Sequence, residues 1–323
     1  MFRYQQSVLS VATKAFKIQR LQILSNHFPS SATTMVQASL FVSASSRPVI
    51  SFIGGGNMAE AILGGLHASG HPGSHLRYSE PLAERRQYMQ QKYPQLAGHA
   101  DNEAAVEGAD VVILAVKPQV LRHVITSLAP TLLKNPSVLV ISIAAGITTG
   151  DMLKWFNATR VPIVRCMPNT PALYGEGALG LYATHNVNTK QRELTESIMH
   201  AVAKEISWVE NESLIDTITG ISGSGPAYFF LIMEAMQNAG MEAGLSLEDA
   251  KALTVQTCLG AARMAQQSED DLATLRRKVT SPKGTTEAAI KSLEANNIRQ
   301  TMRDAVFAAE RRGRELAEEL GRD

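Results

Sequence analysis

The pattern of apolar and polar residues divides the chain into parts of different character. Between residues 48 and 211, short apolar runs alternate with stretches in which apolar residues recur every three or four positions. Beyond about residue 212 the short runs stop and only the helical spacing continues. The first 47 residues stand apart from both by their composition. The chain therefore divides into three regions, residues 1–47, 48–211 and 212–323.

The middle region predicts a parallel sheet. Its expected strands are apolar runs at 49–53, 76–78, 111–116, 138–143 and 161–166. The run at 111–116 is apolar without interruption, as expected when helices cover both faces of a sheet. Helical stretches lie between the strands, one of them after residue 56 and a polar one at 83–93. This alternation is typical of a doubly wound α/β fold.

The last region predicts helices only. They are expected at 228–243, 247–266, 272–278, 285–296 and 298–320. These stretches are rich in Ala, Leu and Met and leave little room for a large core of their own. An all-helical domain that packs against another copy of itself explains both observations.

Composition narrows the class of protein. The length of 323 residues fits two domains, and the net charge of +1 offers no basic field for nucleic acid. No apolar run approaches the roughly 20 residues needed to span a bilayer. The two cysteines, Cys166 and Cys258, lack metal-ligand spacing and are expected to be reduced thiols. We expect a soluble cytoplasmic protein.

The N-terminal 47 residues carry basic residues and many serines, and no acidic residue occurs before Glu60. That composition is typical of an organellar transit peptide, which would place the protein in mitochondria. The alternative is a disordered extension, or an upstream start codon with Met35 as the true beginning. In either case this segment is kept out of the fold.

The strongest local signal is the segment Gly54-Gly55-Gly56-Asn57-Met58-Ala59, which has the form G-x-G-x-x-A. It directly follows a predicted strand and directly precedes a predicted helix, the context in which this motif binds dinucleotides. Gly54 permits the tight turn, Gly56 lets a pyrophosphate approach the backbone, and Ala59 allows close packing of helix on strand. A glycine-rich turn without a ligand is the alternative. The motif predicts an NADH or NADPH cofactor.

The end of the second predicted strand bears on the choice between these cofactors. Glu80 is placed to hold the ribose 2′-hydroxyl of NADH, whereas Ser79, Arg85 and Arg86 leave NADPH open. At the end of the next strand Lys117 either faces the cofactor or is simply solvated. The sequence leaves both questions open.

A hydroxyl-rich turn at 279–286 opens a predicted helix. Free backbone N–H groups beside hydroxyls suit a carboxylate. The alternative is that Thr285 or Thr286 merely caps its own helix. A third segment, 220–228, places small residues and Pro226 at a helix start, where close packing is sufficient explanation.

Several segments occur together and in order. They are the Gly54 loop and residues 115–118, 142–146, 167–171, 222–228 and 281–286. This ordered set resembles the pyrroline-5-carboxylate reductase family from about Val49 to the C-terminus. The resemblance implies reduction of 1-pyrroline-5-carboxylate to L-proline, the last step of proline biosynthesis. It also implies a Rossmann-type NAD(P)-binding domain at 48–211 and a helical dimerisation and substrate domain at 212–323, in a homodimer that can assemble further.

The resemblance implies particular site residues. Those at the cofactor would be Gly54, Gly56, Asn57, Met58, Ser79, Glu80, Asn102, Ala115, Val116, Lys117, Pro118 and Ala144. Those at the substrate would be Val279, Ser281, Gly284, Thr285 and Thr286. Thr286, or a water beside it, would hydrogen-bond the imine nitrogen and is the candidate catalytic residue. Lys283 departs from the family pattern, which usually has Gly there. It would strain the loop if the position needs a positive φ, and the alternative is that it adds charge near the carboxylate.

The chemistry hardly requires a protein acid or base, because a protonated imine is already a strong hydride acceptor. His67, His71 and His75 share a four-residue spacing, but Gly70 and Pro72 interrupt the helix that would align them, so no metal site is expected. One rival is a reductase of the 3-hydroxyacid dehydrogenase type, which would want a Lys that the 222–228 helix start lacks. The other is a non-catalytic nicotinamide-nucleotide-sensing protein.

Overall fold

A computed structural model describes residues 47–321, so the expectations for the N-terminal segment lie outside the described residues. The strands are β1 (Ile50–Ile53), β2 (Leu76–Ser79), β3 (Ala97–His99), β4 (Val111–Leu114), β5 (Leu139–Ser142), β6 (Ile163–Met167), β7 (Gly177–Ala183) and β8 (Ala203–Val209). The helices that accompany them are α2 (Asn57–Ala68), α3 (Ala83–Lys92), α4 (Asn102–Val106), α5 (Pro118–Leu132), α6 (Thr149–Phe156) and α7 (Thr189–Met199). Short 3₁₀ turns are η2 (Gly73–His75) and η3 (Thr170–Tyr174).

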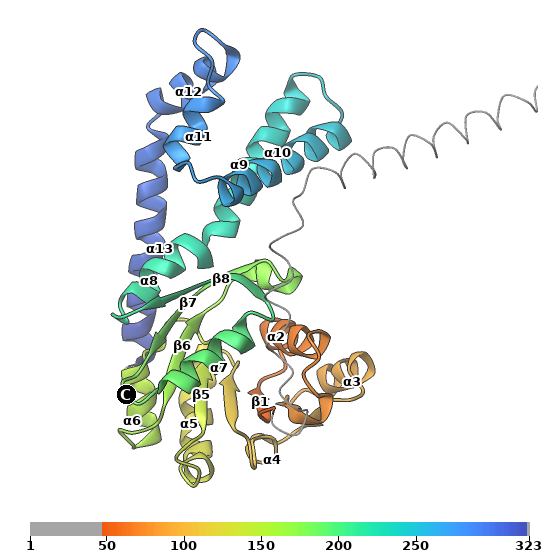
Figure 1. The fold of residues 1–323 in the computed structure, drawn as a ribbon, viewed down its shortest axis with the longest axis vertical. Helices are drawn as coiled ribbons and strands as arrows, with labels where there is room; N and C mark the ends of the chain where they lie inside the picture. The colour runs from red at the N-terminus through yellow and green to blue at the C-terminus, as the bar shows by residue number, and fades with distance from the viewer. Residues whose placement is uncertain (1–46, 322–323) are drawn as a thin grey trace, which may run out of the picture. The chain divides into compact units, whose positions relative to one another are not determined.

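The strands form one eight-stranded sheet in the order β3-β2-β1-β4-β5-β6-β7-β8 (Figure 1). All neighbouring pairs are parallel except β6 and β7, which are antiparallel. The reversal between β1 and β4 creates the switch point at which doubly wound sheets bind ligands. The predicted α/β fold is confirmed, with the antiparallel pair as a difference.

Helices cover both faces of the sheet, as the uninterrupted apolar strands predict. Alternate residues of β1 point to opposite sides: Phe52 packs in a core beneath α2, and Ile53 packs in a second core beneath α5. Both side chains are fully buried. The two cores fix the carboxyl ends of the central strands, where the site lies.

Beyond β8 the chain is helical. The elements are α8 (Leu214–Ile218), a π-helical turn η4 (Thr219–Gly223), α9 (Gly225–Glu242), α10 (Leu247–Gln267), α11 (Leu272–Lys278), α12 (Thr285–Ala295) and α13 (Ile298–Gly321). Helix α13 runs from this region back to the sheet (Figure 1). A Cβ added at Gly146, after β5, would lie 3.1 Å from Cβ of Leu316 on α13. The last helix therefore packs against a loop of the sheet.

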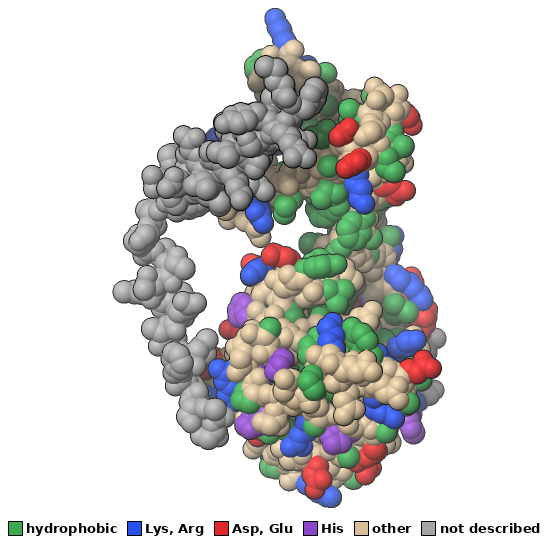
Figure 2. Space-filling view, turned by 90° about the vertical axis from the view of Figure 1, so that its right-hand side faces the viewer, with side chains coloured by type: hydrophobic (Ala, Val, Ile, Leu, Met, Phe, Trp, Pro, Cys, Tyr) green, Lys and Arg blue, Asp and Glu red, His purple; other side chains and the backbone are tan. Residues whose placement is uncertain are grey.

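The helical region exposes many large apolar side chains. On α9 they are Phe229, Phe230, Leu231, Ile232, Met236 and Met241, each at least 40% exposed. Figure 2 shows hydrophobic side chains gathered over the upper, helical part. Apolar patches of this kind mark interaction surfaces. Within the described residues, no helix is long and apolar enough to cross a membrane.

Candidate functional site

The loop between β1 and α2 is shaped so that only glycine fits its first position. Gly54 has φ +103°, and a Cβ there would lie 2.7 Å from the carbonyl oxygen of Ala115. Its N–H donates to the carbonyl of Ser79 at 2.9 Å, which holds the loop against β2. The tight turn expected of the first glycine in the motif is therefore present.

The next part of this loop leaves room for a ligand. Gly56 is the N-cap of α2 and supplies no side-chain cap, and a Cβ added to it would meet nothing within 4 Å. The first helical hydrogen bond runs from Glu60 N to Gly56 O, so the N–H groups of Asn57 and Met58 point outward without helical partners. This cradle of free donors suits a pyrophosphate.

The sheet order brings the predicted cofactor residues to one edge. They follow the carboxyl ends of five neighbouring strands, β3, β2, β1, β4 and β5. Asn102 is the first residue of α4, Lys117 is the exposed N-cap of α5, and Ala144 is buried behind β5. β4 ends at Leu114, two residues before the predicted end at Val116, so Ala115, Val116 and Lys117 form the connection from β4 to α5.

Glu80 does not point freely into this edge. Its side chain accepts from Gly55 N at 3.1 Å and from Leu82 N at 3.0 Å, and only 9% of the residue is exposed. Arg86 donates to the carbonyls of Glu80 and Pro81 at 2.6 and 2.8 Å. The Glu80 carboxylate therefore points toward backbone N–H groups, and hydrogen bonds to two backbone carbonyls hold the Arg86 side chain beside it.

Arg85 is held by an ion pair with Glu60 on α2 at 2.5 Å and donates to the carbonyl of Gly55 at 2.7 Å. Burial raises the pKa of the Glu60 carboxyl, but hydrogen bonds from Lys92 and Arg85 outweigh it and lower that pKa below its usual range. The carboxylate stays charged at neutral pH. This network fixes α3 against α2 beside the cofactor loop.

The predicted substrate loop lies between α11 and α12. Gly284 N donates to Ser281 O at 3.0 Å across a turn with Pro282 second and Lys283 third. Gly284 is the N-cap of α12 and has no side chain to cap it, so neither threonine that follows caps the helix. The hydroxyls of Thr285 and Thr286 and the first N–H groups of α12 are free to meet a carboxylate.

Lys283 has φ +59°, in the left-handed region. Within residues 47–321, the other non-glycine residues with positive φ are both asparagines, the type that tolerates this conformation best. The third position of a type II turn, in which proline is often second, requires a positive φ and favours glycine. The strain expected from lysine is therefore present in the backbone. Lys283 N donates to the Glu287 carboxylate at 2.7 Å, which helps to hold the turn.

We expect Lys283→Gly to raise the free energy of unfolding by about 1 kcal/mol, because glycine relieves the left-handed strain at this position. Lys283→Asn should give part of that gain, since asparagine tolerates the same φ. Urea denaturation of the three proteins measures the difference. A lower stability for both variants would show that the lysine side chain stabilises the loop by more than the strain costs.

The two loops do not meet within one chain. The Gly54 loop lies at the carboxyl edge of the sheet, and the turn between α11 and α12 lies at the opposite end of the helical region (Figure 1). The exposed apolar side chains of α9 belong to the same helical region. One chain therefore presents a cofactor loop and a substrate loop at separate places.

Sequence reasoning gave no role to a buried ionic group at the junction with the helical region. Arg165 on β6 is 3% exposed and pairs with Asp216 at 3.1 Å and with Glu212 at 3.3 Å. Glu212 also accepts from the backbone N and the hydroxyl of Thr149, the first residue of α6, at 2.7 Å each. The sequence did contain a signal for this group, because Arg165 lies within an otherwise apolar predicted strand.

Asn169 is a second residue whose individual role was missed. It is buried, donates to the carbonyl of Ser222 at 3.1 Å and accepts from Ala178 N at 3.0 Å. Through it the 167–171 and 222–228 segments, which the sequence singles out separately, are joined. Asn169 therefore connects the segment after β6 to η4 and to the start of β7.

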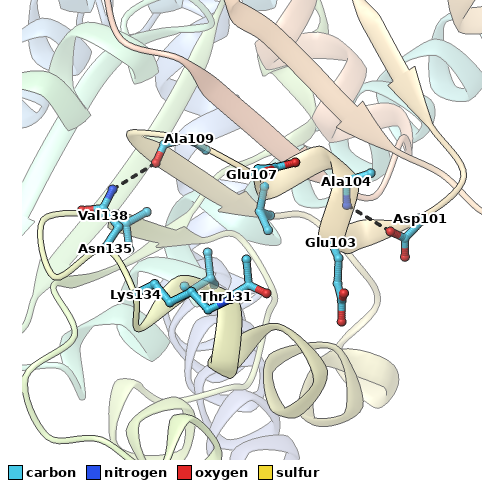
Figure 3. Close-up of a pocket in the computed structure, with 12 residues that line it drawn as sticks. Asp101, Glu103, Ala104, Glu107, Ala109, Thr131, Lys134, Asn135 and Val138 are labelled. Carbon is cyan, nitrogen blue, oxygen red and sulfur yellow. Dashed lines mark hydrogen bonds between the residues drawn. The ribbon is translucent and has the colours of Figure 1, made fainter.

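A polar cavity of about 500 Å³ lies elsewhere, between α4 and the turn before β5 (Figure 3). Its lining includes Glu107 and Ala109 before β4 and Asn135 and Val138 before β5, at the amino ends of the strands. Asn135 is tied to the carbonyl of Ala109. Its lining also includes Asp101 and Glu103, which flank Asn102 at the start of α4, but it includes no residue of the Gly54 loop.

The histidines and cysteine singled out in the sequence do not form a further site within the described residues. Among residues 47–321, no three His, Cys, Asp or Glu side chains are grouped as metal ligands. His67 packs edge-on against Tyr93, and His71 hydrogen-bonds the carbonyl of Pro48. Burial raises the pKa of the Cys166 thiol far above its usual range, so it stays protonated and is a poor nucleophile.

Comparison with known proteins decides the family. A curated pyrroline-5-carboxylate reductase from Pseudomonas aeruginosa is 50% identical over 276 residues, covering 85% of this chain and 99% of the relative. The chain belongs to the pyrroline-5-carboxylate reductase family. The family profile described as pyrroline-5-carboxylate reductase dimerisation matches residues 212–316. The profile described as NADP oxidoreductase, coenzyme F420-dependent, matches residues 49–146.

Solved structures agree with this family. A pyrroline-5-carboxylate reductase from Coxiella burnetii superposes with a TM-score of 0.79 at 44% identity and covers 84% of this chain and 98% of its own. The Plasmodium falciparum pyrroline carboxylate reductase, solved with NADP bound, gives a TM-score of 0.74 at 30% identity with the same coverage. The resemblance drawn from ordered motifs is therefore confirmed.

Proposed function

We propose that this protein reduces 1-pyrroline-5-carboxylate to L-proline with NADH or NADPH, the last step of proline biosynthesis. The observation that carries the proposal is 50% identity along nearly the whole length of a curated enzyme of that name. The open glycine cradle at the start of α2 and the uncapped start of α12 support it, because one suits a dinucleotide and the other a carboxylate.

We assign the residues as follows. The pyrophosphate would lie on the N–H groups of Asn57 and Met58, with Asn102 toward the ribose and Ala144 beside the nicotinamide. The substrate-loop residues Val279, Ser281, Gly284, Thr285 and Thr286 would surround the substrate. When bound, the reduced nicotinamide supplies the hydride.

The chain itself supplies binding and orientation. The first N–H groups of α12 would hold the substrate carboxylate, with the positive end of the helix dipole toward it. The Thr286 hydroxyl, or a water beside it, would hydrogen-bond the imine nitrogen and fix the acceptor carbon toward the nicotinamide edge. A protonated imine accepts a hydride without further activation, so positioning is the main contribution of the protein.

The active unit we propose is a homodimer in which the substrate loop of one chain meets the cofactor loop of the other. The separation of the two loops within one chain and the exposed apolar helices support this arrangement. The match of residues 212–316 to a dimerisation profile supports it as well. Dimers would assemble further through remaining surfaces. We place the protein in the cytoplasm, or in mitochondria if residues 1–47 act as a transit peptide.

The test is the initial rate of cofactor oxidation with 1-pyrroline-5-carboxylate, measured for the parent and for Thr286→Ala. We expect turnover by the parent and a kcat lower by about a hundredfold in the variant, with a smaller change in KM, because the lost hydroxyl acts on the nitrogen and not on the carboxylate. An unchanged kcat would remove Thr286 from the mechanism. Cofactor binding without any turnover by the parent would favour the nucleotide-sensing alternative.

A further inference from the structure

The loop between β5 and α6, residues 143–148, is held at one end by a side chain from the start of the helical region. We propose that this side chain, Glu212, is a positioning residue for hydride transfer: its contacts with Thr149 keep the loop in the conformation that receives the nicotinamide. The inference rests on the proposed function for the placement of Ala144 beside the nicotinamide.

The end of the loop next to β5 is fixed by the sheet itself. Ile143 N donates to a carbonyl of β4 at 3.1 Å, and Ala144 N donates to the Ser142 hydroxyl at 3.4 Å. Gly146 has φ +74°, so the chain reverses there through a left-handed residue. The position of the loop then depends on its other end, where α6 begins.

Glu212 holds that other end with both carboxylate oxygens. Oε1 accepts from Thr149 N and Oε2 accepts from the Thr149 hydroxyl, at 2.7 Å each, and Thr149 is only 4% exposed. Helix α6 already has a local cap, because the Thr148 hydroxyl accepts from Asp151 N at 3.1 Å. A second cap from a residue 63 positions away in the sequence exceeds what the helix needs in order to begin. Its additional effect is to fix where α6 begins, and hence where the loop before it ends.

Arg165 sets the direction of the Glu212 side chain. It is paired in register with Ser142, the last residue of β5, and its Nη1 donates to Glu212 Oε1 at 3.3 Å. Its Nη2 donates to Asp216 on α8 at 3.1 Å, so the same guanidinium holds the start of the helical region on the sheet. Charge-assisted hydrogen bonds of this kind are strong and directional. The first helical residues and the loop after β5 are therefore linked through one carboxylate.

The test uses two ligands that differ in the nicotinamide half, so that it does not depend on turnover. Isothermal titration calorimetry measures the affinity of the intact protein for NADPH and for adenosine 2′,5′-bisphosphate, which lacks the nicotinamide. Thr149→Val removes the hydroxyl that donates to Glu212 and keeps the shape of the side chain. It should weaken NADPH by about tenfold and leave the bisphosphate within about twofold, because only NADPH reaches the loop. Thr189→Val, the same change at the exposed first residue of α7, should alter neither affinity.

Thr149→Ser separates positioning from packing. Serine keeps the hydroxyl but loses a buried methyl group, so its affinity for NADPH should stay within about twofold of that of the parent. If Thr149 served only to fill space, serine would be the weaker variant, because it leaves a cavity that valine does not. That order overturns the inference, as does an unchanged NADPH affinity or an equal loss of both ligands in Thr149→Val.

A double-mutant cycle assigns the effect to Glu212. Glu212→Ala should weaken NADPH by at least about tenfold while the bisphosphate still binds, which also shows that the protein is folded. Adding Thr149→Val to it should change the NADPH affinity by less than about twofold, since the partner of the hydroxyl is already lost. Losses that multiply would make the two residues independent and overturn the inference. If the affinities behave as expected but the parent does not reduce the imine, the proposed function alone fails.

Discussion

Replacing Gly54 with alanine is expected to weaken cofactor binding by about a hundredfold, because the new Cβ would lie 2.7 Å from the Ala115 carbonyl at a φ of +103°. The backbone would have to move, and the N–H groups beyond it would no longer converge on a pyrophosphate. Fluorescence quenching of the protein by NADPH measures the affinity. Gly70→Ala is the matched control, since Gly70 also has a positive φ but a Cβ there meets nothing within 4 Å.

Mixing variants then tests how the site is assembled. Chains carrying Gly54→Ala and chains carrying Thr286→Ala are each nearly inactive, but a mixed dimer would contain one site with both parent residues if the loops come from different chains. Random pairing on co-expression gives such an intact site at about a quarter of positions. Activity near that fraction supports the proposed dimer. No recovery in a purified mixed dimer would place both loops of a site in the same chain.

Arg165→Met is expected to lower the free energy of unfolding by about 3–5 kcal/mol. The substitution keeps much of the side-chain volume but leaves the carboxylates of Asp216 and Glu212 without their cation, and Asp216 is only 6% exposed. Buried charges without a partner are far more costly than an exposed pair that is broken. Urea denaturation followed by circular dichroism measures the change.

Arg312→Met serves as the control for this prediction. Arg312 pairs with Glu315 and Glu319 on the exposed face of α13 and should leave the denaturation midpoint nearly unchanged. Equal effects of the two substitutions would mean that the Arg165 group is no more important than a surface pair. A further variant, Glu212→Gln, should act in the same direction as Arg165→Met and by less, because its carboxylate side chain is 20% exposed.

Periodicity predicted the helices from α10 onward closely, since α11 occupies the residues expected and α10 differs by one at its end. It did not predict α8, and α9 begins at Gly225 instead of at 228. The middle region was less complete. β3 is three residues with a glycine, β8 mixes Lys204 and Glu205 with apolar residues, and β7 carries two glycines, so none shows the apolar run of a buried strand. Polar edge strands are stabilised by pairing with neighbours that a local pattern does not contain.

The candidate site, too, could be predicted from the sequence only in part. The Gly54 motif could be predicted because its chemistry lies within six consecutive residues. The orientation of Glu80 could not, because one of its two donors is the N–H of Gly55, 25 residues away in the sequence. The sequence predicted strain at Lys283 only on the condition that its φ is positive. Whether it is positive depends on the turn, which is closed by the hydrogen bond from Gly284 N to Ser281 O. Residue types can indicate a ligand, whereas the direction of a side chain is set by tertiary contacts.

The packing of α13 on the sheet also bears on the order of events during synthesis. The loop after β5, which we place beside the nicotinamide, is covered by Leu316, and Asp151 at the start of α6 lies against Gly321. These partners lie on α13, which is synthesised after every strand of the sheet. The nucleotide-binding half can form its strands early, but this covering arrives only after α13 has been synthesised. A nascent chain released before Leu316 would therefore expose the loop after β5.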